Sequence, residues 1–169
     1  MMTIKPIEKD QYHYPVEWNA GKDADYLSQW AGIKYQYPLT VEQIAERDAM
    51  ENVHIYAAFQ EDSEKNEPAM VGCVELEEMT PGQAGNVARF IVAEQEQGKG
   101  LGALILKSLI DTAFTTLGLT KLSLRVYCYN AAAIRCYEKC GFRVKKYLPG
   151  EQPKWNCYSM ELRKEWLQM

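Results

Sequence analysis

The stretch VARFIVAEQEQGKGLGALILKSL, residues 87–109, decides the fold. It opens with an apolar run and closes with apolar residues spaced three or four apart, which predicts a strand followed by a helix. Between them stand Gly98, Gly100 and Gly102. Fixing a glycine in one conformation costs more backbone entropy than fixing any other residue, and a helix start usually carries Ser or Asp as its cap. Amides at a helix N-terminus carry partial positive charge, and glycines let an anion approach them. The turn therefore predicts an anion-binding site.

Two common phosphate-binding patterns do not fit this turn. A P-loop needs Ser or Thr after its lysine, but Lys99 is followed by Gly100. Gly98, Gly100 and Ala103 fit the dinucleotide fingerprint G-x-G-x-x-A. However, the next predicted strand, 121–130, has no acid to hold a ribose, and the turn follows three strands instead of opening a domain.

A third pattern, Gln97-x-x-Gly100-x-Gly102 between a strand and a helix, fits fully. Its amides suit a pyrophosphate, and Lys99 adds a mobile positive charge. The alternative is a flexible glycine turn that binds nothing.

The remaining residues predict a mixed α/β sheet. Expected strands are an edge strand at 3–9, a meander at 54–60, 69–79 and 86–94, an alternating strand at 121–130, and a closing pair at 142–148 and 156–162. Expected helices cover 22–32, 40–50, 101–117 and 131–140. We therefore expect six to seven strands, mostly antiparallel with one parallel pair, and about four flanking helices.

Composition bounds the class of protein. The chain has 169 residues with 47% hydrophobic and 25% charged, which predicts one globular domain. No apolar run approaches the roughly 20 residues of a membrane span, and the N-terminus lacks a signal peptide's apolar segment. Five cysteines, an odd number mostly within apolar segments, indicate reduced thiols. We expect a cytoplasmic protein without membrane association.

Charge and histidine content restrict the ligands. The net charge of −4 argues against nucleic acid as the main partner. Cys136 and Cys140 are four apart, but with only two histidines in the chain we expect no metal. Residues 41–80 carry eleven acids against two bases, whereas residues from 121 onward carry ten bases against four acids. Either both segments form charged surfaces that only face solvent, or the acidic segment attracts cations and the basic segment attracts anions.

A second motif lies about thirty residues beyond the turn. In YNAAAIRCYEKCGFR, Asn130 can cap a helix, and Tyr137 follows two helical turns later. Together with Gln97-x-x-Gly100-x-Gly102, this motif resembles the GNAT superfamily of acetyl-CoA-dependent N-acetyltransferases. The two motifs span 86–143, and the strand order extends the resemblance over 53–163.

The resemblance implies where acetyl-CoA binds. The strand of Arg89–Val92 would splay from the strand at 121–129, and the pantetheine would pair with the backbone of the first of these strands, with the pyrophosphate on the turn. The implied cofactor-binding residues are Phe90, Ile91, Val92, Gln97, Gly98, Lys99, Gly100, Leu101, Gly102, Ala103, Asn130, Ala133 and Tyr137. The alternative for Asn130 is that it only caps the helix and does not contact the cofactor.

The resemblance also implies catalytic roles. Tyr137 matches the general acid that protonates the leaving thiolate, with a packed aromatic as the alternative; a phenol of pKa about 10 is protonated at neutral pH. The base is less clear, because the strand position where some family members carry a glutamate is Arg89 here. Glu75 and Glu77, or a water chain, remain as candidates, and we select Glu75.

The acceptor would bind on residues 1–52, with 53–169 forming the acetyl-CoA core. Trp30, Tyr35 and Tyr37 are the expected acceptor-binding residues, because aromatics beside acids suit an amine. The expected acceptor is a protein N-terminal amine, a small amine or a polyamine, acetylated directly in a ternary complex. The alternative is a non-catalytic acyl-CoA-binding or sensing module. A homodimer is also expected from the resemblance.

Overall fold

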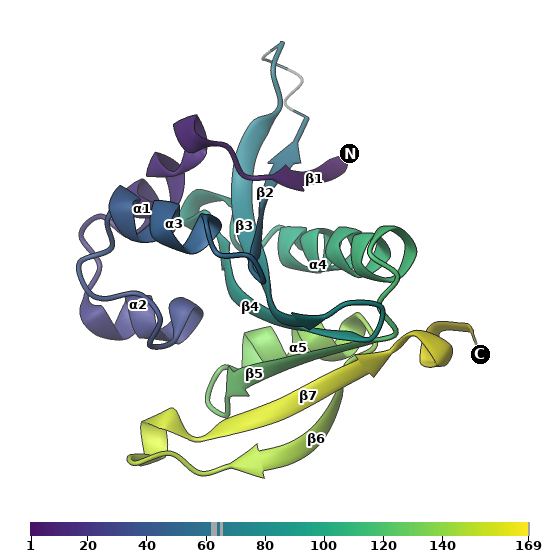
Figure 1. Cartoon of the computed structure of the whole chain (residues 1–169). Coiled ribbons are helices and arrows are strands. Elements are labelled where there is room, and N and C mark those ends of the chain that lie inside the picture. Colours follow the sequence, from purple (N-terminus) through teal and green to yellow (C-terminus); the bar gives the residue numbers. More distant parts are fainter. Residues whose placement is uncertain (62–63, 65, 169) are drawn as a thin grey trace. The chain divides into compact units, whose positions relative to one another are not determined.

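The computed structural model describes residues 1–61, 64 and 66–168. Within them, seven strands form one sheet in the order β1-β2-β3-β4-β5-β7-β6 (Figure 1). The strands are β1 Met2–Pro6, β2 His54–Gln60, β3 Ala69–Thr80, β4 Ala84–Val92, β5 Lys121–Tyr127, β6 Arg143–Leu148 and β7 Cys157–Arg163. The predicted mixed sheet is therefore confirmed.

The sheet has one parallel pair. Strands β4 and β5 pair in parallel from Ala84 opposite Lys121 to Val87 opposite Leu124. By contrast, β1–β2, β2–β3, β5–β7 and β6–β7 pair antiparallel. The closing hairpin thus places β7, not β6, beside β5. The predicted strand at 121–130 is three residues too long, because the chain turns after Tyr127.

The helices are α1 His13–Trp18, α2 Ala24–Ala31, α3 Val41–Asp48, α4 Leu101–Asp111 and α5 Ala131–Lys139. Four were predicted, and α1 was missed because a six-residue helix shows too little periodicity. The helix predicted over 101–117 changes at Thr112–Thr116 to a π-helical turn. Thr40 caps α3 as predicted, with its Oγ1 accepting from the Gln43 amide at 3.3 Å.

Contacts divide the chain into two compact units. The first comprises residues 1–77 and 88–101, and the second comprises 78–87 and 102–169. The divisions in β3 and β4 lie next to two non-glycine residues with positive φ, Glu78 at 50° and Arg89 at 44°. The first unit carries eight Lys and Arg against seventeen Asp and Glu, a net charge of −9; the second carries eleven against six, a net charge of +5.

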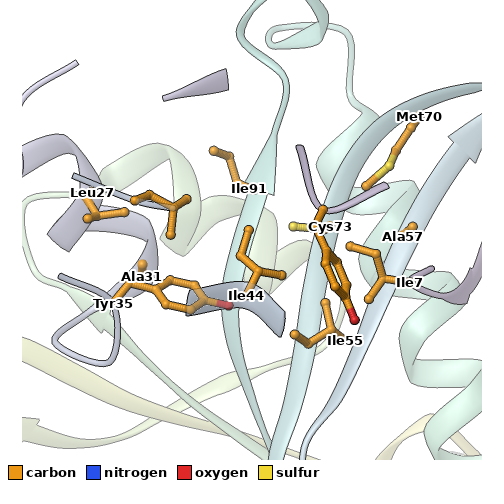
Figure 2. Close-up of a cluster of buried hydrophobic side chains, with 12 residues drawn as sticks. Ile7, Leu27, Ala31, Tyr35, Ile44, Ile55, Ala57, Met70, Cys73 and Ile91 are labelled. Carbon is orange, nitrogen blue, oxygen red and sulfur yellow. The ribbon is translucent and has the colours of Figure 1, made fainter. Parts of the chain in front are cut away.

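The first unit has its own apolar core. Figure 2 shows side chains from β2, β3, β4, α2 and α3 gathered in one cluster with Ile7, which directly follows β1. Its buried members are Ile7, Tyr12, Leu27, Ala31, Tyr35, Leu39, Ile44, Ile55, Ala57, Met70, Cys73 and Ile91. Leu27 and Ala31 of α2 are four apart, as expected for the buried face of an amphipathic helix, and α3 contributes Ile44.

In the second unit, the buried side chains follow the predicted periodicities. Strand β5 alternates strictly, with Leu122, Leu124 and Val126 buried. Helix α4 buries Ile105, Leu106 and Leu109 on one face. No helix among the described residues is long and apolar enough to cross a membrane.

Candidate functional site

The glycine turn joins β4 to α4. A short 3-10 helix, Glu94–Glu96, follows the strand, and the Gln97 side-chain amide donates to the Val92 carbonyl at 2.9 Å. Lys99 forms an ion pair with Glu96, Nζ to Oε2 at 3.0 Å, in an exposed position. Through its hydrogen bond to Val92, the Gln97 side chain fixes the turn to the end of the strand, a contact that a flexible linker would not make.

Two glycines of the turn hold conformations that other residues rarely adopt. Gly98 has φ 81° and Gly100 has φ 78°. A Cβ at either position would meet nothing within 4 Å, so backbone conformation and not lack of space requires glycine. The open space outside these residues leaves their backbone accessible, and α4 follows with its first amides unpaired within the helix. These features fit an anionic ligand such as a pyrophosphate.

Strand β4 leads into this turn. Its parallel pairing with β5 ends at Val87, and the strand continues to Val92. Ile91 is buried in the core, while Phe90 and Val92 are half-buried. The predicted pantetheine residues therefore lie in the part of β4 that follows the strained Arg89.

Asn130 is the N-cap of α5. Its Oδ1 accepts from the Ala133 amide at 3.2 Å, the bond expected of an N-terminal cap. Three residues separate the end of β5 at Tyr127 from the start of the helix at Ala131. Asn130 and Ala133 thus lie at the end of α5 that follows the carboxyl end of β5.

Tyr137 lies in the last two turns of α5. Its ring packs edge-on against Phe142, with 6.0 Å between centroids. The side chain is half-buried. Burial raises the pKa of its phenol above the ordinary value of 10, and the neighbouring Cys136 acts in the same direction. The phenol is thus fully protonated at neutral pH and can donate a hydrogen bond.

Four charged side chains form a buried cluster in the first unit. They are Arg47 of α3, Glu75 and Glu77 of β3, and Arg89 of β4, each at most 8% exposed. Arg47 contacts Glu75 (Nε to Oε1, 2.7 Å) and Glu77 (Nη2 to Oε1, 2.8 Å). Arg89 forms ion pairs with the same two carboxylates. We call this set the charge tetrad.

The charge tetrad is electrically balanced, with two guanidinium groups and two carboxylates. Burial alone would lower the pKa of Arg47, but its hydrogen bond to Glu75 and the charges of both glutamates raise it. Both oxygens of Glu75 accept from guanidinium groups, one from Arg47 and one from Arg89. Glu75 is only 1% exposed, so its carboxylate is held by these guanidinium groups and not by bulk solvent.

A small cavity lies beside the tetrad in the first unit. Its lining includes Trp30, Tyr35, Cys73, Glu75 and Arg89. The space open to the centre of a water molecule is about 10 Å³, close to the minimum for one water. Burial and the charge of Glu75 raise the pKa of Tyr35, so its phenol is neutral. Two of the three predicted acceptor residues thus line one cavity with the predicted base.

Tyr37 lies apart from this cavity. It is 56% exposed, in the loop between α2 and α3. The Gln43 side chain holds that loop, accepting from the Gln36 amide at 2.6 Å and donating to the carbonyls of Gln36 (3.0 Å) and Pro38 (2.9 Å). The loop around Tyr37 is therefore fixed from α3.

Arg47 was missed by sequence reasoning. It lies three residues after Ile44, so both fall on the buried face of α3. An arginine on an apolar helix face requires a buried acidic partner, and that signal was available in the sequence. In the described part of the chain, no group of three or more His, Cys, Asp or Glu could hold a metal ion.

The model of the Acetyltransferase (GNAT) family matches residues 22–142, well over half of the chain. The chain belongs to this acetyltransferase family. The activity predicted from the two motifs, acetyl transfer from acetyl-CoA to an amine, is thereby confirmed, and this GNAT acetyltransferase is an enzyme and not a sensing module.

Curated relatives extend the match over most of the acetyltransferase. A spermidine N(1)-acetyltransferase of Vibrio cholerae is 28% identical over 155 residues, covering 89% of this chain and 83% of that protein. The spermidine N(1)-acetyltransferase of Escherichia coli is 27% identical over 150 residues, covering 89% and 77%. An aminoglycoside N(6')-acetyltransferase of Klebsiella pneumoniae is 36% identical over only 66 residues, which cover 39% of this chain and 32% of that protein.

Solved structures support the fold. A spermidine N-acetyltransferase from Vibrio cholerae in complex with CoA and spermine has a TM-score of 0.79 at 22% identity and covers 97% of this chain and 96% of that one. A chimera of the Vibrio cholerae enzyme matches with a TM-score of 0.77 at 21% identity, covering 99% of both chains. At these identities the comparison concerns the fold alone.

Proposed function

We propose that this GNAT acetyltransferase transfers the acetyl group of acetyl-CoA to a primary amine of a polyamine. The observation that carries the proposal is its similarity, over 89% of the chain, to two spermidine N(1)-acetyltransferases. The similarity to the aminoglycoside enzyme covers less than half of the chain and so carries less weight.

Charge supports a polycationic acceptor. The first unit, which holds Trp30, Tyr35 and Tyr37, has a net charge of −9. Within it, the charge tetrad is neutral, so the excess acids lie elsewhere in that unit. A surface of one sign concentrates ligands of the opposite sign and speeds their association, an effect that salt weakens. A spermidine-like cation suits this charge better than a neutral amine does.

Acetyl-CoA would bind through backbone groups. We assign the pyrophosphate to the amides of Gly98, Lys99, Gly100, Leu101, Gly102 and Ala103, with Gln97 anchoring the turn. The pantetheine would pair with the backbone of Phe90, Ile91 and Val92 as an added strand does. Asn130 and Ala133 would contact the pantetheine arm in addition to forming the helix cap.

Tyr137 would act as the general acid. Its raised pKa keeps the proton on the phenol across the neutral range, so the group can donate to the departing thiolate as the bond to the acetyl carbon breaks. Such a donor contributes about 10²–10⁴-fold to a rate. The hydroxyl is thus the group whose removal should lower turnover while leaving cofactor binding unchanged.

The amine must lose a proton before it attacks. A polyamine ammonium has a pKa near that of lysine, about 10.4, so few molecules are neutral at pH 7. We propose Glu75 as the base, acting through water, because both of its oxygens are already bound to guanidinium groups. The adjoining cavity, about 10 Å³, matches one water molecule.

The test is an acetylation assay with acetyl-CoA and a panel of spermidine, spermine, a peptide with a free N-terminus and kanamycin, read by mass spectrometry of the amine. We expect acetylated spermidine or spermine at a kcat/KM at least about tenfold above the others. Tyr137→Phe should lower kcat about a hundredfold or more without weakening CoA binding. Acetylation of the peptide or kanamycin alone would refute the polyamine proposal.

A further inference from the structure

The hydroxyl of Tyr35 is buried in the first unit without a hydrogen-bond partner. The side chain is 8% exposed, and Figure 2 shows its phenol oxygen directed inward, toward Ile44. Among the residues that the structure describes, none forms a hydrogen bond with this hydroxyl, whereas every polar side-chain atom that water cannot touch has a partner. Because a buried tyrosine hydroxyl needs a partner, the Tyr35 hydroxyl must border space that water can enter.

The small cavity beside the charge tetrad provides that space. Tyr35, Ile44 and Glu75 all line it, and the volume open to the centre of a water molecule is about 10 Å³, enough for one molecule. Trp30, another lining residue, already donates its indole N–H to Oδ1 of Asn19 at 2.9 Å. The Tyr35 hydroxyl and the tetrad are therefore the main polar groups toward which a water in this cavity can turn.

The Glu75 carboxylate retains the capacity to accept from such a water. Its Oε1 accepts from Nε of Arg47, and its Oε2 accepts from Nε of Arg89. Each carboxylate oxygen has two lone pairs, so each of the two can accept one further hydrogen bond. A water that donates to Glu75 and accepts from Tyr35 has the two polar partners that a buried water needs at minimum.

The groups around the Tyr35 hydroxyl keep it protonated. Facing it are Cys73 and Glu75 of β3, Arg47 of α3 and Arg89 of β4. Burial and the charges of Glu75 and Cys73 raise the pKa of the phenol, and the two arginines oppose this rise without cancelling it. The Cys73 thiol is neutral as well, because burial and Glu75 raise its pKa to about 12. At neutral pH the Tyr35 hydroxyl is thus a hydrogen-bond donor.

We propose that one ordered water in this cavity bridges the Tyr35 hydroxyl and the Glu75 carboxylate, and that Tyr35 is a positioning residue for proton transfer from the amine. The water oxygen accepts from the hydroxyl with one lone pair and takes a proton from the ammonium with the other. It gives one of its own protons to Glu75. The amine becomes neutral, the carboxylate becomes protonated, the water is unchanged, and Tyr35 keeps its proton.

The two parts of the proposal rest on different ground. The effect on acetyl transfer rests on the proposed role of Glu75 as base, whereas the water site follows from the cavity and the unpartnered hydroxyl. In this role Tyr35 serves the acceptor through a water and not by direct contact.

A crystal structure of the protein at a resolution that shows ordered water tests the site directly. We expect one water within about 3.2 Å of both the Tyr35 hydroxyl and a Glu75 oxygen, and its loss in Tyr35→Phe. A dry cavity, or a water on Glu75 beyond hydrogen-bond distance of Tyr35, would overturn the proposal. The wild-type structure decides this even if the variant does not fold.

The pH dependence of the kinetics tests the positioning role. At pH 7, Tyr35→Phe should lower kcat for spermidine about tenfold, the effect of removing one hydrogen bond, with the KM for acetyl-CoA unchanged. The loss should shrink toward about pH 9.5, because more of an amine with a pKa near 10.4 is then neutral before it binds. A loss of equal size at every pH would indicate a merely structural effect and would overturn the positioning role.

Tyr56→Phe is the matched control. Tyr56 is 6% exposed in β2 of the same unit, and its hydroxyl lies 3.4 Å from Nδ1 of His54. Because its neighbour Ile55 lines the cavity, Tyr56 lies on the opposite face of the strand. This variant should retain wild-type kcat at every pH, and a loss like that of Tyr35→Phe would refute a specific role for Tyr35. If the wild-type protein acetylates no amine at all, the proposed function fails, whereas the crystal structure still decides the water site.

Discussion

Replacing Arg89 with methionine tests whether the charge tetrad is a balanced unit. The substitution roughly preserves volume but leaves Glu75 and Glu77 with Arg47 alone, so the buried cluster changes from neutral to one net negative charge. Removing one partner of a buried ion pair costs about 3–5 kcal/mol. For a chain of this length, we expect the melting temperature to fall by about 6–20 °C.

The assay is urea unfolding at pH 7.5, followed by circular dichroism and tryptophan fluorescence. A matched double variant, Arg89→Met with Glu77→Gln, restores neutrality and should recover part of the loss, since the two residues share a contact. The reasoning is refuted if Arg89→Met costs less than about 1 kcal/mol, the value of an exposed pair. It is also refuted if the losses in the double variant simply add.

Two further predictions concern the glycine turn and a buried tyrosine. Gly100→Ala should cost about 1–2 kcal/mol of backbone strain and weaken CoA binding in calorimetric titration; Gly82→Ala, a control at a similar φ of 72° with equally open space, should show the strain without the binding loss. Burial and the hydrogen bond to Asp48 raise the pKa of Tyr12 to about 12, above the ordinary 10 of the unfolded chain. The folded state therefore binds the Tyr12 proton more tightly than the unfolded chain does. The contribution of this group to the free energy of unfolding is fully present below pH 10 and should be lost between about pH 10 and 12. Unfolding free energies of Tyr12→Phe measured across that range should lack this slope, and an equal slope in both proteins would contradict the assignment.

Local signals in the sequence were enough for most of the fold. The alternation of 121–127, the glycine-rich turn after β4 and the Asn130 cap each depend on neighbours within a few residues. The structure confirms them as a strand, a turn between a strand and a helix, and a helix cap. Local signals failed where the chain was short or irregular. The six residues of α1 show too few turns for a period to emerge, and the π-helical turn at Thr112–Thr116 keeps an apolar spacing close to that of an α-helix.

The candidate site also combines features that local sequence predicts with features that only the tertiary structure gives. The predicted acetyl-CoA residues come from two contiguous motifs, so the sequence alone determined the family, the glycine turn and the position of Tyr137. The partners of Glu75 could not be predicted, since Arg47 and Arg89 lie 28 and 14 residues away and reach it from a helix and a neighbouring strand. Which distant charges share a desolvated space depends on chain closure and packing. For that reason only the tertiary structure decided that Glu75 is a paired, buried carboxylate beside Trp30 and Tyr35.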